Sequence, residues 1–253
     1  MATATLARFV CLEALRSGLP RLAGAALVLA LGLAAFLSQV ALTESRPLQI
    51  AVVASVLRAA AVFLIAAHVS SSTLREINDK GLELMLALPL PRATLYLGRL
   101  GGYVLCAVAL CIAFSLPLLL WSAPLALAGW AASLACELAL VAAAALFFSM
   151  TLGQLVPAMA ATLGLYLLGR SIDVLRAIAA GPLSEPSVSA QVQRYSLDAV
   201  ALLLPDLGGL TRSEWLLYGL PGAKAYLAGL AGLAIYGALL TAAGLFDFQR
   251  RSA

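Results

Sequence analysis

The sequence predicts an all-α membrane protein with six transmembrane helices, and three observations lead to this fold class. Of the 253 residues, 63% are hydrophobic and only 11% are charged, whereas about 25% of the residues in a soluble domain are charged. The mean hydropathy is +1.00. Uncharged runs of about 20 residues, the length that crosses a bilayer, recur along the chain with charges between them. These observations exclude a soluble enzyme, a disordered chain and a disulfide scaffold.

The apolar runs set the expected elements within a single transmembrane domain over 1–253. The expected transmembrane helices cover 22–42, 48–70, 97–121, 126–149, 154–172 and 224–246. Three of them fit between Leu100 and Gly169, because Glu137 is the only charged residue in that stretch. Residues 5–20 mix apolar positions with arginines, which is typical of an amphipathic helix on the membrane surface; a solvated tail is the alternative.

Residues 173–223 are expected to form an outer loop between the fifth and sixth spans. The loop is polar and irregular, and its apolar run over 199–204 is too short to cross a membrane. Trp215 and Tyr218 are residue types that favour the membrane interface. We therefore expect short re-entrant or interfacial helices here, with a small folded outer domain as the alternative.

Orientation follows from the basic residues. Six crossings place both termini on one side of the membrane, together with the loop between the second and third spans. That side carries Arg8, Arg16, Arg21, Arg75, Lys80, Arg92, Arg99, Arg250 and Arg251. Because cytoplasmic loops are rich in Lys and Arg, we expect both termini to be cytoplasmic. The net charge of +4 then has a membrane explanation and implies no nucleic-acid partner.

Catalytic motifs are missing from the sequence. Neither of the two lysines, Lys80 and Lys224, stands in a GxxxxGK[ST] motif, so the chain has no P-loop. His68 is the only histidine, which excludes a multi-histidine metal site. No GxSxG motif is present. We expect no catalytic residue, no metal ligand and no directly bound cofactor.

The polar segment over 71–92 is expected to form a short amphipathic helix between the second and third spans. Glu76 and Lys80 form an i,i+4 pair in the favourable order. An apolar stripe runs through Ile77, Leu84 and Leu88. Proline at 89 and 91 ends the helix, because proline disfavours the helical conformation of the residue before it. A solvated loop helix without a partner has the same charge pairs.

This segment resembles the signature of type-2 ABC exporter permeases. The matching residues are Arg75-Glu76, Asp79-Lys80-Gly81-Leu82-Glu83-Leu84, Leu88-Pro89, Pro91-Arg92, Tyr96 and Gly98-Arg99-Leu100-Gly101. The chain departs from the pattern with arginine at 99, where lysine is commoner, and leucine at 82, where threonine often stands. The surface helix, six spans and basic C-terminus are also similar. Within that family the chain looks closest to permeases of multicopper-enzyme maturation and haem-exporter-like permeases.

The resemblance implies a bacterial inner-membrane subunit that works as a homodimer or heterodimer with two separate ATPase subunits, which bind ATP and Mg²⁺. The segment 71–92 would be the coupling helix that docks in the ATPase. Its polar contacts would come from Arg75, Glu76, Asp79, Lys80 and Glu83. Leu84, Leu88 and Pro89 would seat the helix, and Arg92 with Arg99 would anchor the return into the membrane.

Two charges lie deep in the expected bilayer, Arg58 near the middle of the second span and Glu137 near the middle of the fourth. Ionisable groups within a membrane usually pair or face a wet cavity. We expect these two either to pair with each other, statically, or to line a pathway within the dimer.

The expected function is that of an ABC exporter permease whose cargo is not readable from the sequence. The alternatives are an ATPase-coupled assembly or mechanotransmission factor, with a periplasmic partner and no cargo, and an ATPase-independent membrane scaffold. In each case the chain itself is not an enzyme, and membrane lipids surround it.

Overall fold

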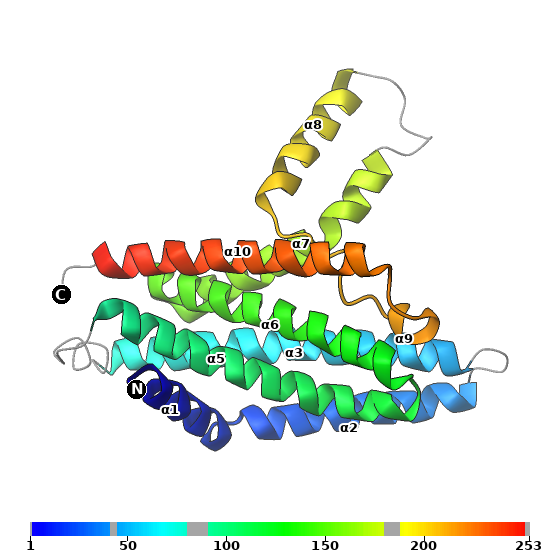
Figure 1. Cartoon of the computed structure of the whole chain (residues 1–253), viewed down its shortest axis with the longest axis horizontal. Coiled ribbons are helices and arrows are strands. Elements are labelled where there is room, and N and C mark those ends of the chain that lie inside the picture. Colours follow the sequence, from blue (N-terminus) through cyan, green and yellow to red (C-terminus); the bar gives the residue numbers. More distant parts are fainter. Residues whose placement is uncertain (1, 41–44, 80–90, 180–187, 251–253) are drawn as a thin grey trace.

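The computed structural model describes residues 2–40, 45–79, 91–179 and 188–250 (Figure 1). All regular structure in these ranges is helical. The elements are α1 (Ala2–Arg16), α2 (Leu19–Val40), α3 (Ser45–Asn78), α5 (Arg92–Ser115), the 3-10 helix η1 (Leu116–Leu120), α6 (Pro124–Leu152), α7 (Leu155–Ala179), α8 (Val188–Leu203), α9 (Trp215–Tyr218) and α10 (Ala223–Arg250).

Six of the described helical segments are long and apolar enough to cross a membrane: α2, α3, α5 with η1, α6, α7 and α10. The prediction of an all-α, multi-pass membrane protein is confirmed at this level. Two of these helices extend well past the predicted spans. α3 continues to Asn78 instead of ending at residue 70, and α7 continues to Ala179 instead of ending at 172. α3 packs against α5, and α7 packs against α8. In the polar turns of α3, Ser72 also donates a hydrogen bond to Glu13 on α1.

The bundle has two distinct ends. The basal end contains α1, the last turns of α3, the first turns of α5 and the last turns of α10 (Figure 1). There Arg92 donates a hydrogen bond of 3.1 Å to the carbonyl oxygen of Gln249, and the rings of Tyr96 and Phe248 lie 6.1 Å apart. The distal end contains the first turns of α3, α9 and the first turns of α10.

α6 lies at the centre of the bundle, in contact with α3, α5, α7 and α10. Most of the run Val141–Leu146 is alanine, and all of it is buried. These small side chains let the neighbouring helices approach α6 closely. Pro124 stands in the first turn of α6, where its missing N–H costs nothing. Gly153, with φ of 66°, ends the helix in the left-handed conformation that glycine adopts easily.

α1 packs along α5 through two glycines. A Cβ at Gly98 would lie 3.0 Å from Cβ of Leu6, and one at Gly102 would lie 2.6 Å from Cβ of Val10. The close approach therefore requires glycine at both positions. The small face of α1 is buried there, while Phe9 and Leu15 remain exposed. The helix predicted over 5–20 is thus a helix that ends at residue 16.

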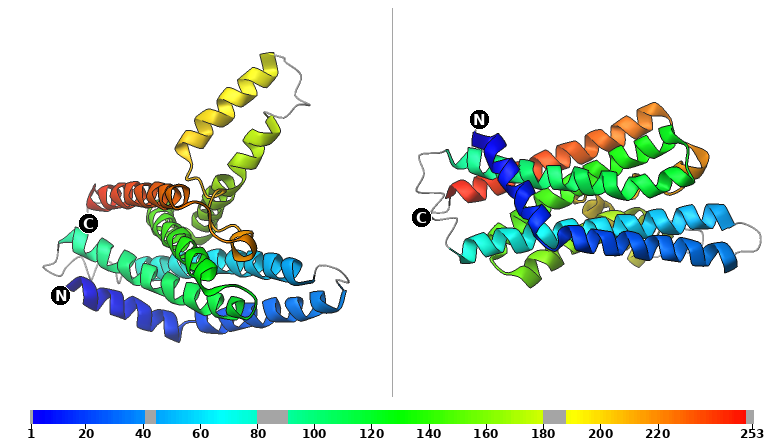
Figure 2. Two further views of the ribbon diagram at one scale, coloured as in Figure 1. Left: turned by 45° about the vertical axis from the view of Figure 1, so that its right-hand side comes forward. Right: turned by 90° about the horizontal axis from the view of Figure 1, so that it is seen from below.

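The segment between the fifth and sixth spans contains α8 and α9. α8 folds back on the end of α7, and the two project from the bundle as a helical hairpin (Figure 2). Arg176 and Asp198 join them in an exposed ion pair of 2.8 Å. Arg194 donates a hydrogen bond of 2.9 Å to the carbonyl oxygen of Ala179.

Candidate functional site

The basal end carries a buried ion pair between Glu76 on α3 and Arg99 on α5. The Arg99 side chain is 3% exposed and that of Glu76 is 16% exposed. Glu76 lies near the N-terminal end of the exporter-like pattern, and Arg99 lies near its C-terminal end. The ion pair therefore joins the helix that enters the segment to the helix that leaves it.

A hydrogen-bond network beside this ion pair ties three helices together. Ser72 on α3 donates to a carboxylate oxygen of Glu13 on α1, at 2.9 Å. Tyr103 on α5 donates to the Ser72 hydroxyl at 3.2 Å, and its own hydroxyl lies 3.2 Å from that of Thr73. Ser72, Thr73 and Tyr103 are all buried. Buried polar groups that satisfy one another hold helices in a fixed arrangement, so α1, α3 and α5 form one unit here.

The residues predicted to contact an ATPase fall into four groups. Arg75 and Asp79 are exposed at the end of α3, Glu76 pairs within the chain, and Arg92 begins α5 and bonds to α10. Lys80, Glu83, Leu84, Leu88 and Pro89 lie outside the described residues. Residues 71–78 continue α3 without a break, so the first part of the expected coupling helix belongs to the second span.

A second buried cluster surrounds Glu137, which is fully buried on α6. Its ion-pair partner is Arg170 on α7, at 2.9 Å. The pairing with Arg58 that we expected is therefore replaced by one with Arg170. Arg58, on α3, instead donates a hydrogen bond of 2.7 Å to the carbonyl oxygen of Thr211.

Arg170 also holds the distal loop, which we define as residues 204–214. Nη1 of Arg170, the atom that pairs with Glu137, also donates to the carbonyl oxygens of Leu207, at 2.6 Å, and Leu210, at 2.9 Å. Thr211 has φ of 48°, a left-handed conformation that is uncommon for threonine. It presents its carbonyl oxygen to Arg58. Two helices, α3 and α7, thus each contribute one arginine to the attachment of the distal loop, and Glu137 on α6 pairs with the second of them.

Sequence reasoning did not single out Arg170, although the expected fifth span over 154–172 contains it. One signal could have found it: an ionisable group such as Glu137 inside a membrane usually has a partner of opposite charge, so every basic residue within a span is a candidate. In the structure α7 continues for more than two turns after Arg170.

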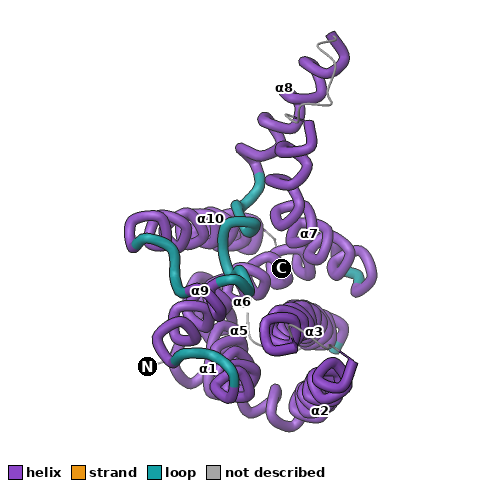
Figure 3. Tube along the Cα trace, turned by 90° about the vertical axis from the view of Figure 1, so that its right-hand side faces the viewer, coloured by secondary structure: helices purple, strands orange, loops and turns teal. Residues whose placement is uncertain are grey.

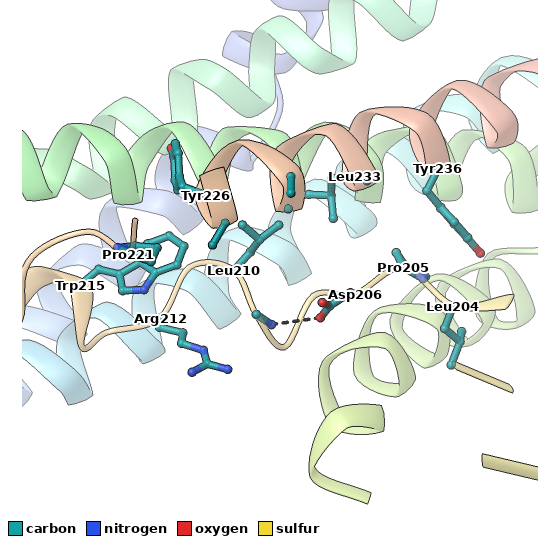
Figure 4. Close-up of a pocket in the computed structure, with 15 residues that line it drawn as sticks. Leu204, Pro205, Asp206, Leu210, Arg212, Trp215, Pro221, Tyr226, Leu233 and Tyr236 are labelled. Atoms are coloured by element: carbon teal, nitrogen blue, oxygen red, sulfur yellow. Dashed lines mark hydrogen bonds between the residues drawn. The ribbon is translucent and has the colours of Figure 1, made fainter. Parts of the chain in front are cut away.

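The distal loop and one face of α10 enclose a cavity of about 570 Å³ (Figure 4). Its wall is apolar and aromatic, with Trp215 and Tyr226 in an edge-to-face contact of 5.7 Å. The Tyr236 hydroxyl donates to the carbonyl oxygen of Leu203 at 3.2 Å. Arg212 and Asp206 supply charged groups at the lining. This composition suits a mostly apolar molecule with a polar group.

No three metal-binding side chains come together in the part of the chain that the structure describes. Comparison with known proteins adds no relative: no family model matches the chain, and no curated protein matches it.

Proposed function

We propose that the chain is the transmembrane permease subunit of an ABC exporter in a bacterial inner membrane, working as a dimer with two separate ATPase subunits. The observation that carries this proposal is the buried ion pair of Glu76 and Arg99. Both residues belong to the exporter-like sequence pattern. Their pairing braces the two ends of the segment that would receive the ATPase.

The length of α3 suits a lever. With 34 residues and a rise of 1.5 Å per residue, the helix is about 51 Å long, while the hydrocarbon core is about 30 Å thick. About 14 residues of α3 therefore extend beyond the hydrocarbon. On the basal side this extension is tied to α1 and α5 by Ser72 and Glu76. A push on the segment 79–92 would move these helices together.

The orientation that fits this role has the basal end in the cytoplasm. Arg8, Arg16 and Arg75 are exposed at that end, as cytoplasmic flanks of membrane spans require. Both termini are then cytoplasmic, and the distal loop lies toward the opposite side.

The buried charge cluster offers a link between the lever and the distal cavity. Arg58 lies on α3, Glu137 on α6 and Arg170 on α7, and the two arginines hold carbonyl groups of the distal loop. A shift of α3 relative to α6 and α7 would change these contacts and reshape the loop that walls the cavity. The cluster then serves the pathway through its hold on this wall.

The proposal is tested by a pull-down of the detergent-solubilised chain from its native membrane, followed by ATPase measurement and mass-spectrometric identification. We expect a P-loop subunit to be recovered with the wild-type chain and lost with Glu83→Arg. Glu214→Arg is the matched control, because it makes the same charge change at an exposed position near the distal end. Failure to recover an ATPase, or equal recovery with Glu83→Arg, contradicts the proposal.

A further inference from the structure

A second hollow of about 260 Å³ lies at the basal end. Its floor is one face of α3, and its walls are the first turns of α2 and of α7. Figure 3 shows α2 and α7 on opposite sides of α3. We call this hollow the basal groove and define it by Ser17, Leu22, Phe63, Ala67, His68, Ser71, Arg75 and Met159 with their lining neighbours.

The floor of the basal groove changes from apolar to charged along α3. Phe63 and Ala67 lie nearer the middle of the helix, whereas Ser71 and Arg75 lie nearer its basal end. Phe63 and Arg75 are about 18 Å apart along the helix axis at 1.5 Å per residue. Leu22 on α2 and Met159 on α7 continue the apolar portion on either side. An amphiphilic molecule with one charged end would match this change from apolar to charged lining.

The charge of the basal groove favours an anion. Arg75 is exposed, and its guanidinium has no ion-pair partner among the described residues. Arg16 and Arg21, also exposed, flank the Ser17 wall in sequence. Two neighbouring carboxylates are engaged elsewhere: Glu13 accepts a hydrogen bond from Ser72, and Glu76 pairs with Arg99. Asp79, just after the end of α3, is exposed.

A buried and unpaired polar group also faces the groove. His68 lines it and is only 7% exposed. Its Nε2 has no hydrogen-bond partner among the described residues, and its ring lies edge-on to Tyr103 at 6.0 Å. An unpaired buried polar atom costs free energy, so a ligand oxygen within reach of Nε2 would remove that cost.

We propose that the basal groove binds an anionic phospholipid. The phosphate lies at Arg75 and Ser71, with His68 beneath it, and an acyl chain lies along Phe63 between α2 and α7. Lipid is the occupant to which the observations point, because the apolar part of the groove opens on a helix surface that the membrane covers. The bound lipid fills the gap between α2 and α7, each of which packs against α3.

The test is native mass spectrometry of the delipidated, detergent-solubilised chain with phosphatidylglycerol, compared with phosphatidylcholine of the same acyl chains. We expect preferential binding of phosphatidylglycerol. Arg75→Gln should weaken it about tenfold, as expected for loss of a charge-assisted hydrogen bond, and Arg75→Lys should keep most of it. Arg8→Gln is the matched control, since it removes an exposed arginine from the basal end outside the groove.

A further variant and a competitor separate the parts of the site. Ala67→Phe fills the apolar portion and should weaken binding of both lipids without changing any charge. Inorganic phosphate at millimolar concentration should not displace the lipid, because it lacks the acyl chains. Equal binding of the two lipids, equal loss with Arg8→Gln, displacement by inorganic phosphate, or exclusion of lipid by a second copy of the chain would each overturn the proposal. No ATPase is needed, so the result is independent of the proposed function.

Discussion

The buried ion pair of Glu137 and Arg170 makes the sharpest prediction about stability. Glu137 is fully buried, so Arg170→Leu leaves an uncompensated charge inside the bundle. Removing one partner of a buried pair costs about 3–5 kcal/mol. The loss of the bonds to Leu207 and Leu210 adds to this cost. At about 2–4 °C per kcal/mol for a chain of this size, we expect the melting temperature to fall by roughly 6–20 °C.

The chain carries its own reporters for this measurement. All four cysteines are free, and Cys106 and Cys111 are buried, so a thiol-reactive dye follows unfolding in detergent. Arg176→Leu is the control on the same helix, because its ion pair with Asp198 is exposed. Exposed pairs contribute about 0–1 kcal/mol, and we expect a shift of at most about 4 °C.

The double variant Glu137→Leu with Arg170→Leu separates the charge from the loop. Without a buried carboxylate, the double variant should melt above Arg170→Leu, since an apolar pair of similar volume is tolerated where a lone charge is not. The reasoning is refuted if Arg170→Leu has a melting temperature within the range of the Arg176→Leu control. It is also refuted if the decrease in the double variant equals the sum of the decreases in the single variants Glu137→Leu and Arg170→Leu.

Two predictions concern the basal end. Arg99→Leu leaves the Glu76 carboxylate, which is 16% exposed, without its ion-pair partner. The free energy of unfolding should fall by about 3 kcal/mol. A melting temperature equal to that of the wild type would contradict a stabilising role of this ion pair. Gly102→Val should displace α1, because even a Cβ there lies 2.6 Å from an α1 side-chain carbon, and Cys11 should then react faster with maleimide. Gly101→Val is its control, having no atom within 4 Å of its Cβ position; equal labelling in the two variants would show that α1 is seated otherwise.

The fold class could be predicted because each transmembrane helix can be recognised from local sequence alone. An uncharged apolar run of some twenty residues is long enough to cross a bilayer, and its length does not depend on which helices pack beside it. The ends of the helices were harder to predict from the sequence. The polar turns after residue 70 remain helical because Ser72 and Thr73 find partners on α1 and α5, and such partners lie far away in the sequence.

The charged pairs show the same limit. Spacing along one helix suggested Lys80 as the partner of Glu76, whereas the structure pairs Glu76 with Arg99 on another helix. Glu137 was expected to pair with Arg58, because both lie near the middle of an expected span, or to line a pathway with it. The structure pairs Glu137 with Arg170 on α7. Local spacing contains no information on such tertiary choices.

Gly98 was recognised only as part of the exporter-like pattern, and Gly102, the residue after that pattern ends, was not singled out. In the structure Gly98 and Gly102 form the seat of α1. One feature of the sequence can therefore serve both a family resemblance and an internal packing requirement.

The central claim, that an ATPase docks on the segment 71–92, is tested most directly by photo-crosslinking in intact cells. A photoreactive amino acid is placed at position 83 and, as the control, at position 214 near the distal end. We predict an adduct from position 83 with a P-loop ATPase, identified by mass spectrometry, and none from position 214. An adduct pattern that is the same at both positions, or one without an ATPase at position 83, would contradict the claim.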